Sequence, residues 1–564
     1  MGEIATGGRA VEGEGAHVEG DAPEEARRQD CGAEAGGNAE GPWAELRSAK
    51  QPITLSPPEG LGRESHTGGG AERGASRVDT SGMTRSTPMA DGDLDVAVVG
   101  AGAAGTYLAY RLIEARPDWR IALFERSSRI GGRLWSVRVD GLPHPIELGG
   151  MRFMTRQRLI QSVVDELGIE TRPFNTGDQS ARSFLRGVVG DGPDDPDAGS
   201  GYDLPPGERG RSAADLMSGT FMQIVPRAHE LDENGWRRAR ATSTFRGRPL
   251  TDWSIEEAVA AILSPEGHRF ASDAFGYDSG IHPHNAGDAI QYLMGSGNPT
   301  GEARVPVDGM DRIPRELAAR FESLGGSVRL GRDVRRVETG EGSVLLGFAD
   351  GAGVRARRLA LTMPIPALEA LAGASPVIHG PTWRRLYRSI EGFPATKLYC
   401  WYDRPWWRDG SNAPTGTRTT TDLPNRMMFY FDEAPDRPAA ILAAFTDHRR
   451  TEPIVALADG RSGGAPASAG FLEALRGWLA AAHPSADVPA LPVGSAFQHW
   501  GADPRECAWH FWRAGHNSDE IIDLAVQPDP ALPIHLCGEV FSRHGAWVEG
   551  ALGTASTVVD RILE

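Results

Sequence analysis

The chain has 564 residues, of which 40% are hydrophobic, and a formal net charge of -17 from 59 basic and 76 acidic side chains. This length allows two or three domains, and the acidic balance argues against nucleic acid or a membrane surface as a partner. The four cysteines are widely spaced and form no CxxC pair, which argues against a zinc site and a disulfide scaffold. The sequence also has no apolar run of ~20 residues and no signal-peptide pattern. We therefore expect a cytoplasmic enzyme without a bound metal.

The first 92 residues are rich in Gly, Glu, Ala, Ser and Arg and poor in large apolar side chains. Such a segment buries too little surface to offset its chain entropy, so we expect a disordered tail and assign it no function. Met83 and Met89 precede the first predicted strand, which leaves the start of translation open between Met1 and these two positions.

The first predicted elements form a strand–helix–strand unit. An apolar run at 96–99 predicts a buried strand, and the helical pattern behind it continues through Leu112. A second apolar run at 121–124 predicts another strand and ends on Glu125. This order is typical of a dinucleotide site, in which Glu125 accepts hydrogen bonds from the adenosine ribose.

The turn between the first strand and the helix reads GAGAAG at residues 100–105. Gly100 permits the tight turn, Gly102 lets the backbone approach a pyrophosphate, and Gly105 lets helix and strand pack closely. The helix N-terminus offers unpaired N–H groups and a partial positive charge to the phosphates. We therefore predict a dinucleotide site, with a purely structural turn as the alternative.

The next elements are shorter. A hairpin is predicted over 137–146, and Thr155 is expected to cap a helix that ends at Leu167 with Gly168 as its stop. Residues 187–211 are rich in Gly, Pro and Asp and predict a long surface loop.

Helical patterns then continue to about residue 294 and predict an insertion. One of them begins with a capping box formed by Ser254 and Glu257. Behind the insertion, a helix is expected to end at Gly325 and Gly326. Further strands are predicted at 327–330, 334–338, 343–348 and 356–362.

The last part of the chain is predicted as mixed strands and loops from 364 to 530, with an exposed insert near 461–469. A final strand at 534–537 and a closing helix at 550–563 complete the pattern.

The segment RIGGR at 129–133 resembles the FAD-binding signature of the flavin amine oxidases. Four further patches agree with that family in the same order. They are VDGM at 307–310, TTTDLPNRMMFY at 419–430, WHFW at 509–512 and GEVFSRHGAWVEG at 538–550. The second patch resembles the segment of L-amino-acid oxidases that lines the substrate pocket. The resemblance implies an α/β fold, with a Rossmann-like FAD-binding domain, a mixed α+β substrate domain and a helical insert.

This fold divides the chain as follows. The FAD-binding domain is expected at 93–153, 301–364 and 531–564, and the helical and substrate parts at 154–300 and 365–530, behind the tail at 1–92.

The resemblance also assigns the cofactor contacts. By this resemblance the Val334 backbone contacts the adenine, although Val334 could equally be an ordinary core valine. Glu539 binds a ribityl hydroxyl, and the N-terminus of the helix at Gly550 faces the flavin pyrimidine. Cys507 lies one residue before Ala508, which occupies the position of the family's thioether cysteine, so we expect non-covalent FAD. The residues expected to contact FAD are Gly100, Gly102, Ala103, Ala104, Gly105, Glu125, Arg126, Gly132, Arg133, Gly149, Gly150, Met151, Arg152, Val334, Glu539, Trp547 and Val548.

Five residues are assigned to the reaction by the resemblance. Arg152 and Tyr430 are expected to hold the substrate α-carboxylate, since a guanidinium binds a carboxylate through two parallel hydrogen bonds. Lys397, in an otherwise apolar strand, is expected to hold a water against flavin N5. Trp547 walls the pocket, and Ala546, which replaces a more usual glycine, turns its carbonyl toward the amine.

The resemblance thus implies that an L-α-amino acid and O2 are converted to a 2-oxo acid, ammonia and hydrogen peroxide. Three alternatives stay open: an amine or polyamine oxidase, a 2-monooxygenase that yields an amide, and a flavin-binding interaction protein with an inactive site. The side-chain preference is open too, since the tryptophans of the substrate half, Trp401, Trp406, Trp407, Trp509 and Trp512, fit an aromatic substrate and a packed core alike. A homodimer is kept as one option.

Overall fold

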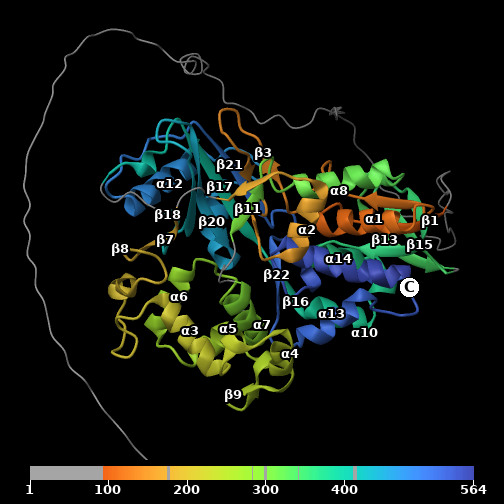
Figure 1. Cartoon of the computed structure of the whole chain (residues 1–564), viewed down its shortest axis with the longest axis horizontal. Coiled ribbons are helices and arrows are strands. Elements are labelled where there is room, and N and C mark those ends of the chain that lie inside the picture. Colours follow the sequence, from red (N-terminus) through yellow and green to blue (C-terminus); the bar gives the residue numbers. More distant parts are fainter. Residues whose placement is uncertain (1–92, 175–177, 283, 297–301, 341, 411–415) are drawn as a thin grey trace, which may run out of the picture. The chain divides into compact units, whose positions relative to one another are not determined.

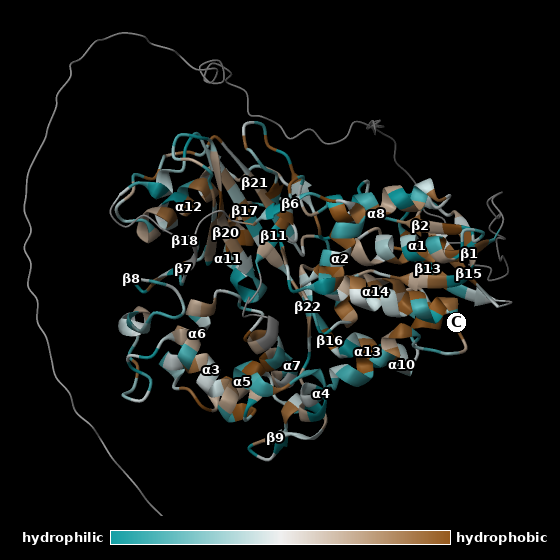
Figure 2. Ribbon diagram, viewed as in Figure 1, coloured by the Kyte–Doolittle hydropathy of each residue, from teal (hydrophilic) through white to brown (hydrophobic). Residues whose placement is uncertain are grey.

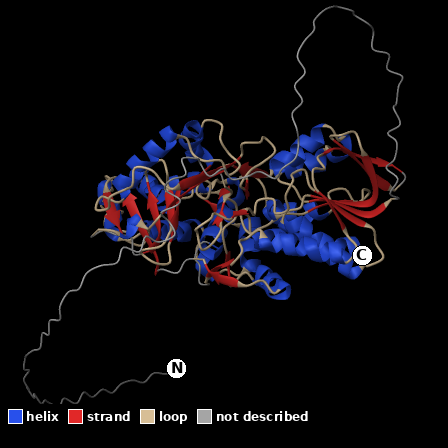
Figure 3. Cartoon of the chain, turned by 90° about the horizontal axis from the view of Figure 1, so that it is seen from above, coloured by secondary structure: helices blue, strands red, loops and turns tan. Residues whose placement is uncertain are grey.

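The computed structural model describes residues 93–174, 178–282, 284–296, 302–340, 342–410 and 416–564 (Figure 1). The predicted disordered tail at 1–92 lies outside these residues. The strands of the described part separate into two large sheets and several small ones (Figure 3).

The first large sheet has seven strands drawn from distant parts of the sequence. In sheet order they are β12 (Ser327–Arg329), β2 (Ile121–Phe124), β1 (Leu94–Val99), β15 (Gly353–Leu361), β14 (Ser343–Phe348) and β13 (Val334–Gly340), with β23 (Ile534–Leu536) beside the end of β15. β1 is parallel to both β2 and β15, and Val99 lies opposite Phe124 and Leu361. The carboxyl ends of these three strands therefore meet at one edge, where open α/β sheets bind ligands.

Helices cover both faces of this sheet. On one face α1 (Ala103–Ala115) packs between α8 (Arg312–Ser323) and α14 (Val548–Leu563). The other face packs against α9 (Ile365–Gly373), α10 (Pro381–Arg388) and α13 (Ser518–Val526).

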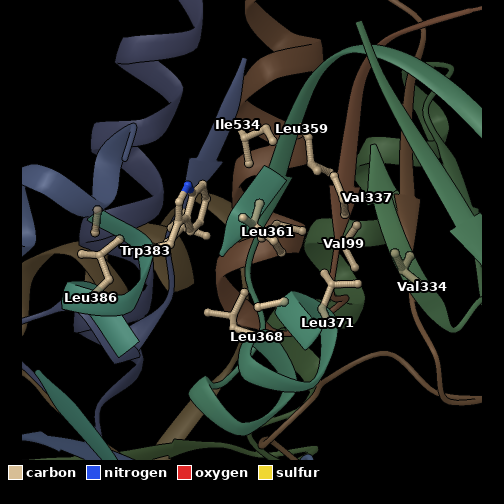
Figure 4. Close-up of a cluster of buried hydrophobic side chains, with 14 of the residues drawn as sticks. Val99, Val334, Val337, Leu359, Leu361, Leu368, Leu371, Trp383, Leu386 and Ile534 are labelled. Atoms are coloured by element: carbon tan, nitrogen blue, oxygen red, sulfur yellow. The ribbon is translucent and has the colours of Figure 1, made fainter. Parts of the chain in front are cut away.

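The buried cluster on this second face includes Val99, Leu361, Leu368, Trp383 and Ile534 (Figure 4). Each fully buried Leu or Ile contributes about 1.5–3 kcal/mol relative to an exposed one. This cluster therefore fixes the sheet edge from which the turn at Gly100 begins.

The second large sheet also has seven strands and is mostly antiparallel. Its strands, in order, are β21 (Gly494–Trp500), β17 (Ala395–Tyr402), β20 (Ala439–Asp447), β19 (Met427–Phe431), β18 (Gly416–Thr421), β7 (Asp178–Leu185) and β8 (Val188–Gly190). All neighbours are antiparallel except β18 and β7. One face packs on α11 (Glu452–Ala458) and α12 (Ala469–Ala482).

A helical block with its own core follows β8 in the chain. Its helices are α3 (Ala213–Ile224), α4 (Glu233–Thr242), α5 (Ile255–Ala260), α6 (Pro265–Phe275) and α7 (Ala286–Gln291). Hydrophobic and hydrophilic residues alternate along these helices (Figure 2), as expected for helices that bury one face.

Short elements join these parts. They are β3 (Ser136–Val137) paired with β4 (Ile146–Glu147), β5 (Phe153–Met154) and β6 (Thr171–Pro173) on either side of β11 (Ala303–Pro306), β9 (Thr244–Phe245) paired with β10 (Arg248–Pro249), β16 (Ile390–Phe393) paired with β22 (Trp509–Trp512), and the helix α2 (Arg158–Leu167).

The structure confirms the strand–helix–strand unit, the strand at 121–124, the capping box of Ser254 and Glu257, and Gly168 as the left-handed stop of α2. The prediction that Thr155 caps α2 is wrong. The helix begins three residues later, because Thr155 is instead tied to Glu302 through its backbone N–H and its hydroxyl.

Two predicted surface segments are also wrong in part. Within 187–211, Ala198 and Leu204 are buried in the core of the helical block. Residues 461–469 lie along β21, where Gly464 donates to the Phe497 carbonyl.

The described residues of 364–530 include five α-helices, α9 to α13, where we expected mixed strands and loops. Their signals are present in the sequence, because Pro381 and Pro453 occupy first turns and Ser468 and Asn517 accept capping hydrogen bonds.

Candidate active site

A cavity of about 1170 Å³ extends from the carboxyl ends of the parallel strands β1, β2 and β15 to the face of the second large sheet. Gly100 and Glu125 line it beside these strand ends, and Arg152 and Lys397 also lie in its wall. A cavity of this size accommodates a ligand larger than a typical small-molecule substrate.

The end beside β1 has the geometry of a phosphate site. α1 begins at Ala103, behind Gly102, without a side-chain cap, so its first N–H groups are left for a ligand. A Cβ on Gly105 would lie 1.9 Å from the Gly100 carbonyl oxygen, which explains why this position requires glycine. Glu125 lines the cavity and binds the turn, accepting from the N–H of Ala101 at 2.9 Å and of Ser127 at 2.8 Å.

Glu539 anchors the wall of the cavity nearest α14. Its carboxylate binds the Arg133 guanidinium and the His510 ring, and it accepts the Ala546 N–H at 3.0 Å. Burial alone would raise the pKa of Glu539, but Arg133 and His510 hold that pKa well below its usual range. Because a carboxylate has about four acceptor positions, these three bonds leave room for one more donor, such as a ribityl hydroxyl.

Ala546 lies next to α14 in a left-handed conformation, with φ of 65°. The left-handed region of backbone angles favours glycine, so an alanine is held in it at a cost in strain. Its N–H bond to Glu539 fixes the turn. The next residue, Trp547, donates from its indole nitrogen to the Tyr292 hydroxyl at 3.2 Å and lines the cavity.

Lys397 is buried in β17 and donates from Nζ to the backbone oxygens of Glu147 (3.1 Å) and Gly149. Burial lowers the pKa of Lys397 to about 7, an effect that the nearby carboxylate of Glu147 only partly offsets. Lys397 is one of two lysines in a chain that otherwise uses arginine. The use of lysine at this position favours a role for its neutral amine, since an arginine does not lose its proton in a protein.

Arg152 lines the cavity with its guanidinium against two aromatic rings. Its Cζ lies 5.1 Å from the Phe174 centroid and 5.6 Å from that of Phe429. Among the described residues Arg152 has no hydrogen-bonded or ion-paired partner. It is therefore available to bind an anion in the cavity.

Tyr430, predicted to share the carboxylate with Arg152, does not line this cavity. It points to the opposite face of the sheet, where its hydroxyl donates to Thr419 at 2.7 Å and contacts the His483 Nε2 at 2.8 Å. Because neighbours on a strand face opposite sides, it is Phe429 that faces the cavity. The prediction that Tyr430 binds the substrate carboxylate is therefore wrong. Its neighbour Phe429 lies in the cavity wall instead and has no hydroxyl to donate.

The tryptophans of the substrate half divide in the same way. Of the five tryptophans singled out in the sequence, Trp509 lines the cavity, whereas Trp406 and Trp407 pack in the core behind the second large sheet and Trp512 in the core of the first. Trp500, which was not singled out, lines the cavity as well. Trp401 is buried outside the cavity.

The structure places the other predicted residues together. Of the predicted cofactor contacts, all but Gly105 line this one cavity, as do Lys397, Arg152, Ala546 and Trp547. Sequence analysis missed the cavity residues Tyr277, Tyr292, Phe429, Phe445 and Arg418. A lone arginine in the threonine-rich run GTRTTT was the available signal for Arg418.

The described residues hold no group of three or more His, Cys, Asp or Glu side chains arranged to bind a metal. None of their helices is both long enough and apolar enough to cross a membrane.

Comparison with known proteins agrees with this geometry. A family profile described as flavin containing amine oxidoreductase matches residues 103–563. Aplysianin-A of Aplysia kurodai is 27% identical over 86% of this chain and 92% of its own. The L-amino-acid oxidase of Mus musculus is 25% identical over 68% of this chain and 58% of its own. A putrescine oxidase redesigned in its cofactor binding has the same fold, with a TM-score of 0.65 and 18% identity over 84% of this chain and 99% of its own.

Proposed function

Since this chain belongs to the flavin-containing amine oxidoreductases, we propose that it oxidises L-α-amino acids to 2-oxo acids, with release of ammonia and hydrogen peroxide. The observation that carries the proposal is Arg152, a cation in the cavity wall that has no hydrogen-bonded or ion-paired partner among the described residues. A simple amine gives such a residue nothing to bind, whereas an amino acid presents a carboxylate.

The cofactor is FAD, and the phosphate end of the cavity fits it. The uncapped start of α1 would hold the pyrophosphate, Glu125 the ribose and Glu539 the ribityl chain. Val548, the first residue of α14, also lines the cavity. FAD, when bound, supplies the hydride acceptor and passes the electrons to oxygen. We propose that it is held without a covalent bond. Flavin that stays with acid-precipitated protein would contradict this.

Within this scheme the chain's own residues orient the substrate and accept a proton. Arg152 holds the carboxylate and so fixes the direction of the substrate Cα hydrogen, a positioning effect that can contribute several kcal/mol. Lys397, neutral above about pH 7, accepts a proton from the water that hydrolyses the imine product. The aromatic wall of Tyr277, Phe445 and Trp509 keeps bulk water from the site.

Two related activities compete with this one: oxidation of an amine or polyamine, and monooxygenation of an amino acid to an amide. The deciding experiment is anaerobic bleaching of the holoenzyme's flavin by L-amino acids, each beside its decarboxylated amine. We expect bleaching by amino acids and not by their amines, and loss of that preference in R152M. Bleaching by amines alone would overturn the proposal, and an amide product in air would move the protein to the monooxygenases.

Cytoplasmic location and small-molecule partners, the amino acid and O2, belong to the same proposal. A homodimer stays a prediction, as do the domain boundaries.

A further inference from the structure

Several arginines line the cavity, and one of them, Arg418, has no role in the proposed reaction. Arg418 lies in β18, directly across from Phe429 in β19, so both side chains leave the same face of the sheet. Phe429 in turn lies under the Arg152 guanidinium. The two arginines therefore flank one phenylalanine ring in the wall of one cavity.

Neither arginine has an anionic partner among the described residues. Arg418 forms no ion pair or hydrogen bond to an acidic side chain there, and the titratable groups that influence it are Tyr277 and Arg152 itself. Burial lowers the pKa of the Arg418 guanidinium, and the positive charge of Arg152 acts in the same direction. The protein thus keeps two partly desolvated positive charges close together.

Such an arrangement is unfavourable without compensation. Buried charges in proteins are paired, because an uncompensated one loses its hydration and gains nothing in return. A single substrate α-carboxylate neutralises one guanidinium and leaves the other. The proposed site of the FAD phosphates is the start of α1, beside the first large sheet, whereas Arg418 lies on β18 of the second.

We propose that Arg418 binds a second carboxylate and that the substrate is an L-amino acid with an acidic side chain. This inference rests on the proposed function and names its substrate class. Arg152 takes the α-carboxylate and Arg418 the side-chain carboxylate, while Phe429 and Phe445 contact the methylene groups between them. Because the Phe429 side chain has no polar group, Arg418 is the donor of this cross-strand pair.

The test compares isosteric substrates in the holoenzyme. L-Glutamate and L-aspartate are measured beside L-glutamine and L-asparagine, with wild type, R418Q and R418K. R404Q is the matched control, since Arg404 is an exposed arginine paired with Asp409 outside the cavity. We expect wild type to prefer the acids in kcat/KM, and R418Q to lose about 10- to 100-fold on the acids but little on the amides. R418K should retain an intermediate preference, and R404Q all of it.

A binding measurement supplies a readout independent of turnover. Glutarate and butyrate, which lack the amine, are titrated against the flavin spectrum. Glutarate should bind more tightly than butyrate to wild type, and R418Q should bring their dissociation constants together.

Several results would overturn the inference. An equal loss on acids and amides in R418Q would show that Arg418 serves the α-carboxylate. A wild-type preference for neutral or basic amino acids would refute the acidic substrate while leaving the proposed function intact. If no amino acid bleaches the flavin, the proposed function itself fails, and this inference with it.

Discussion

The Nζ of Lys397 donates to the backbone oxygen of Glu147 at 3.1 Å, while the carboxylate of Glu147 is bound elsewhere. That carboxylate accepts from the Ser136 hydroxyl at 2.8 Å and from the Met310 N–H at 2.9 Å. Burial raises the pKa of Glu147 and lowers that of Lys397. The buried acid therefore orders the turn before α8, and the lysine stays free to lose its proton near neutral pH.

This pair predicts a pH dependence. The neutral fraction of Lys397 increases as the pH rises through about 7, so the rate of the lysine-dependent step should rise over the same range and level off above it. K397M should lack this rise and lower kcat about 100-fold, as expected for removal of a proton acceptor. Steady-state kinetics from pH 5 to 9, in steps of about one unit, measure both effects.

The anaerobic reduction of the flavin serves as the control for K397M. Substrate binding depends on Arg152, so flavin reduction should be affected less than turnover in air. A K397M profile that still rises through pH 7 would assign the titration to another group.

The glycine-rich turn predicts a contrast between two glycine substitutions. G105A should lose FAD and folded protein, because its methyl group would meet the Gly100 carbonyl oxygen at 1.9 Å. G553A, inside α14, has open space around the added Cβ and should gain about 0.5–1 kcal/mol of stability. Flavin content and thermal unfolding measure both. Normal flavin binding by G105A would refute the close packing of α1 on β1.

Opposite faces of β19 predict opposite results for neighbouring residues. Y430F removes the hydroxyl that joins Thr419 and His483 and should cost about 1–3 kcal/mol of unfolding free energy, with KM unchanged. F429A opens the cavity beneath Arg152 and should raise KM, and because Phe429 is buried it should also cost about 3–5 kcal/mol of unfolding free energy. Denaturant unfolding and steady-state kinetics separate the two effects. A raised KM in Y430F would restore the original assignment of this tyrosine.

The success and the failure of sequence analysis have physical causes here. The site at Gly100 to Glu125 could be predicted because strand, turn, helix and acid are consecutive in the chain and their spacing reports the geometry directly. Arg418 and Phe429 could not, since they become neighbours only through the pairing of β18 with β19. A shift of one residue in a strand exchanges the two faces, which is why Tyr430 was placed in the cavity in error.

Strain at Ala546 predicts a stabilising substitution within the site. A non-glycine residue at φ of 65° costs about 1–2 kcal/mol, and glycine removes that cost at the expense of some chain entropy. A546G should therefore raise the unfolding free energy by about 1 kcal/mol, while the N–H bond to Glu539 persists. Thermal unfolding of the holoenzyme measures the gain, and G553A, which replaces a glycine by alanine, serves as the reference. The loss of the Ala546 methyl group also widens the cavity beside Trp547, so amino acids with larger side chains should have a higher kcat/KM. Lower stability in A546G would mean that packing of the methyl group outweighs the backbone strain.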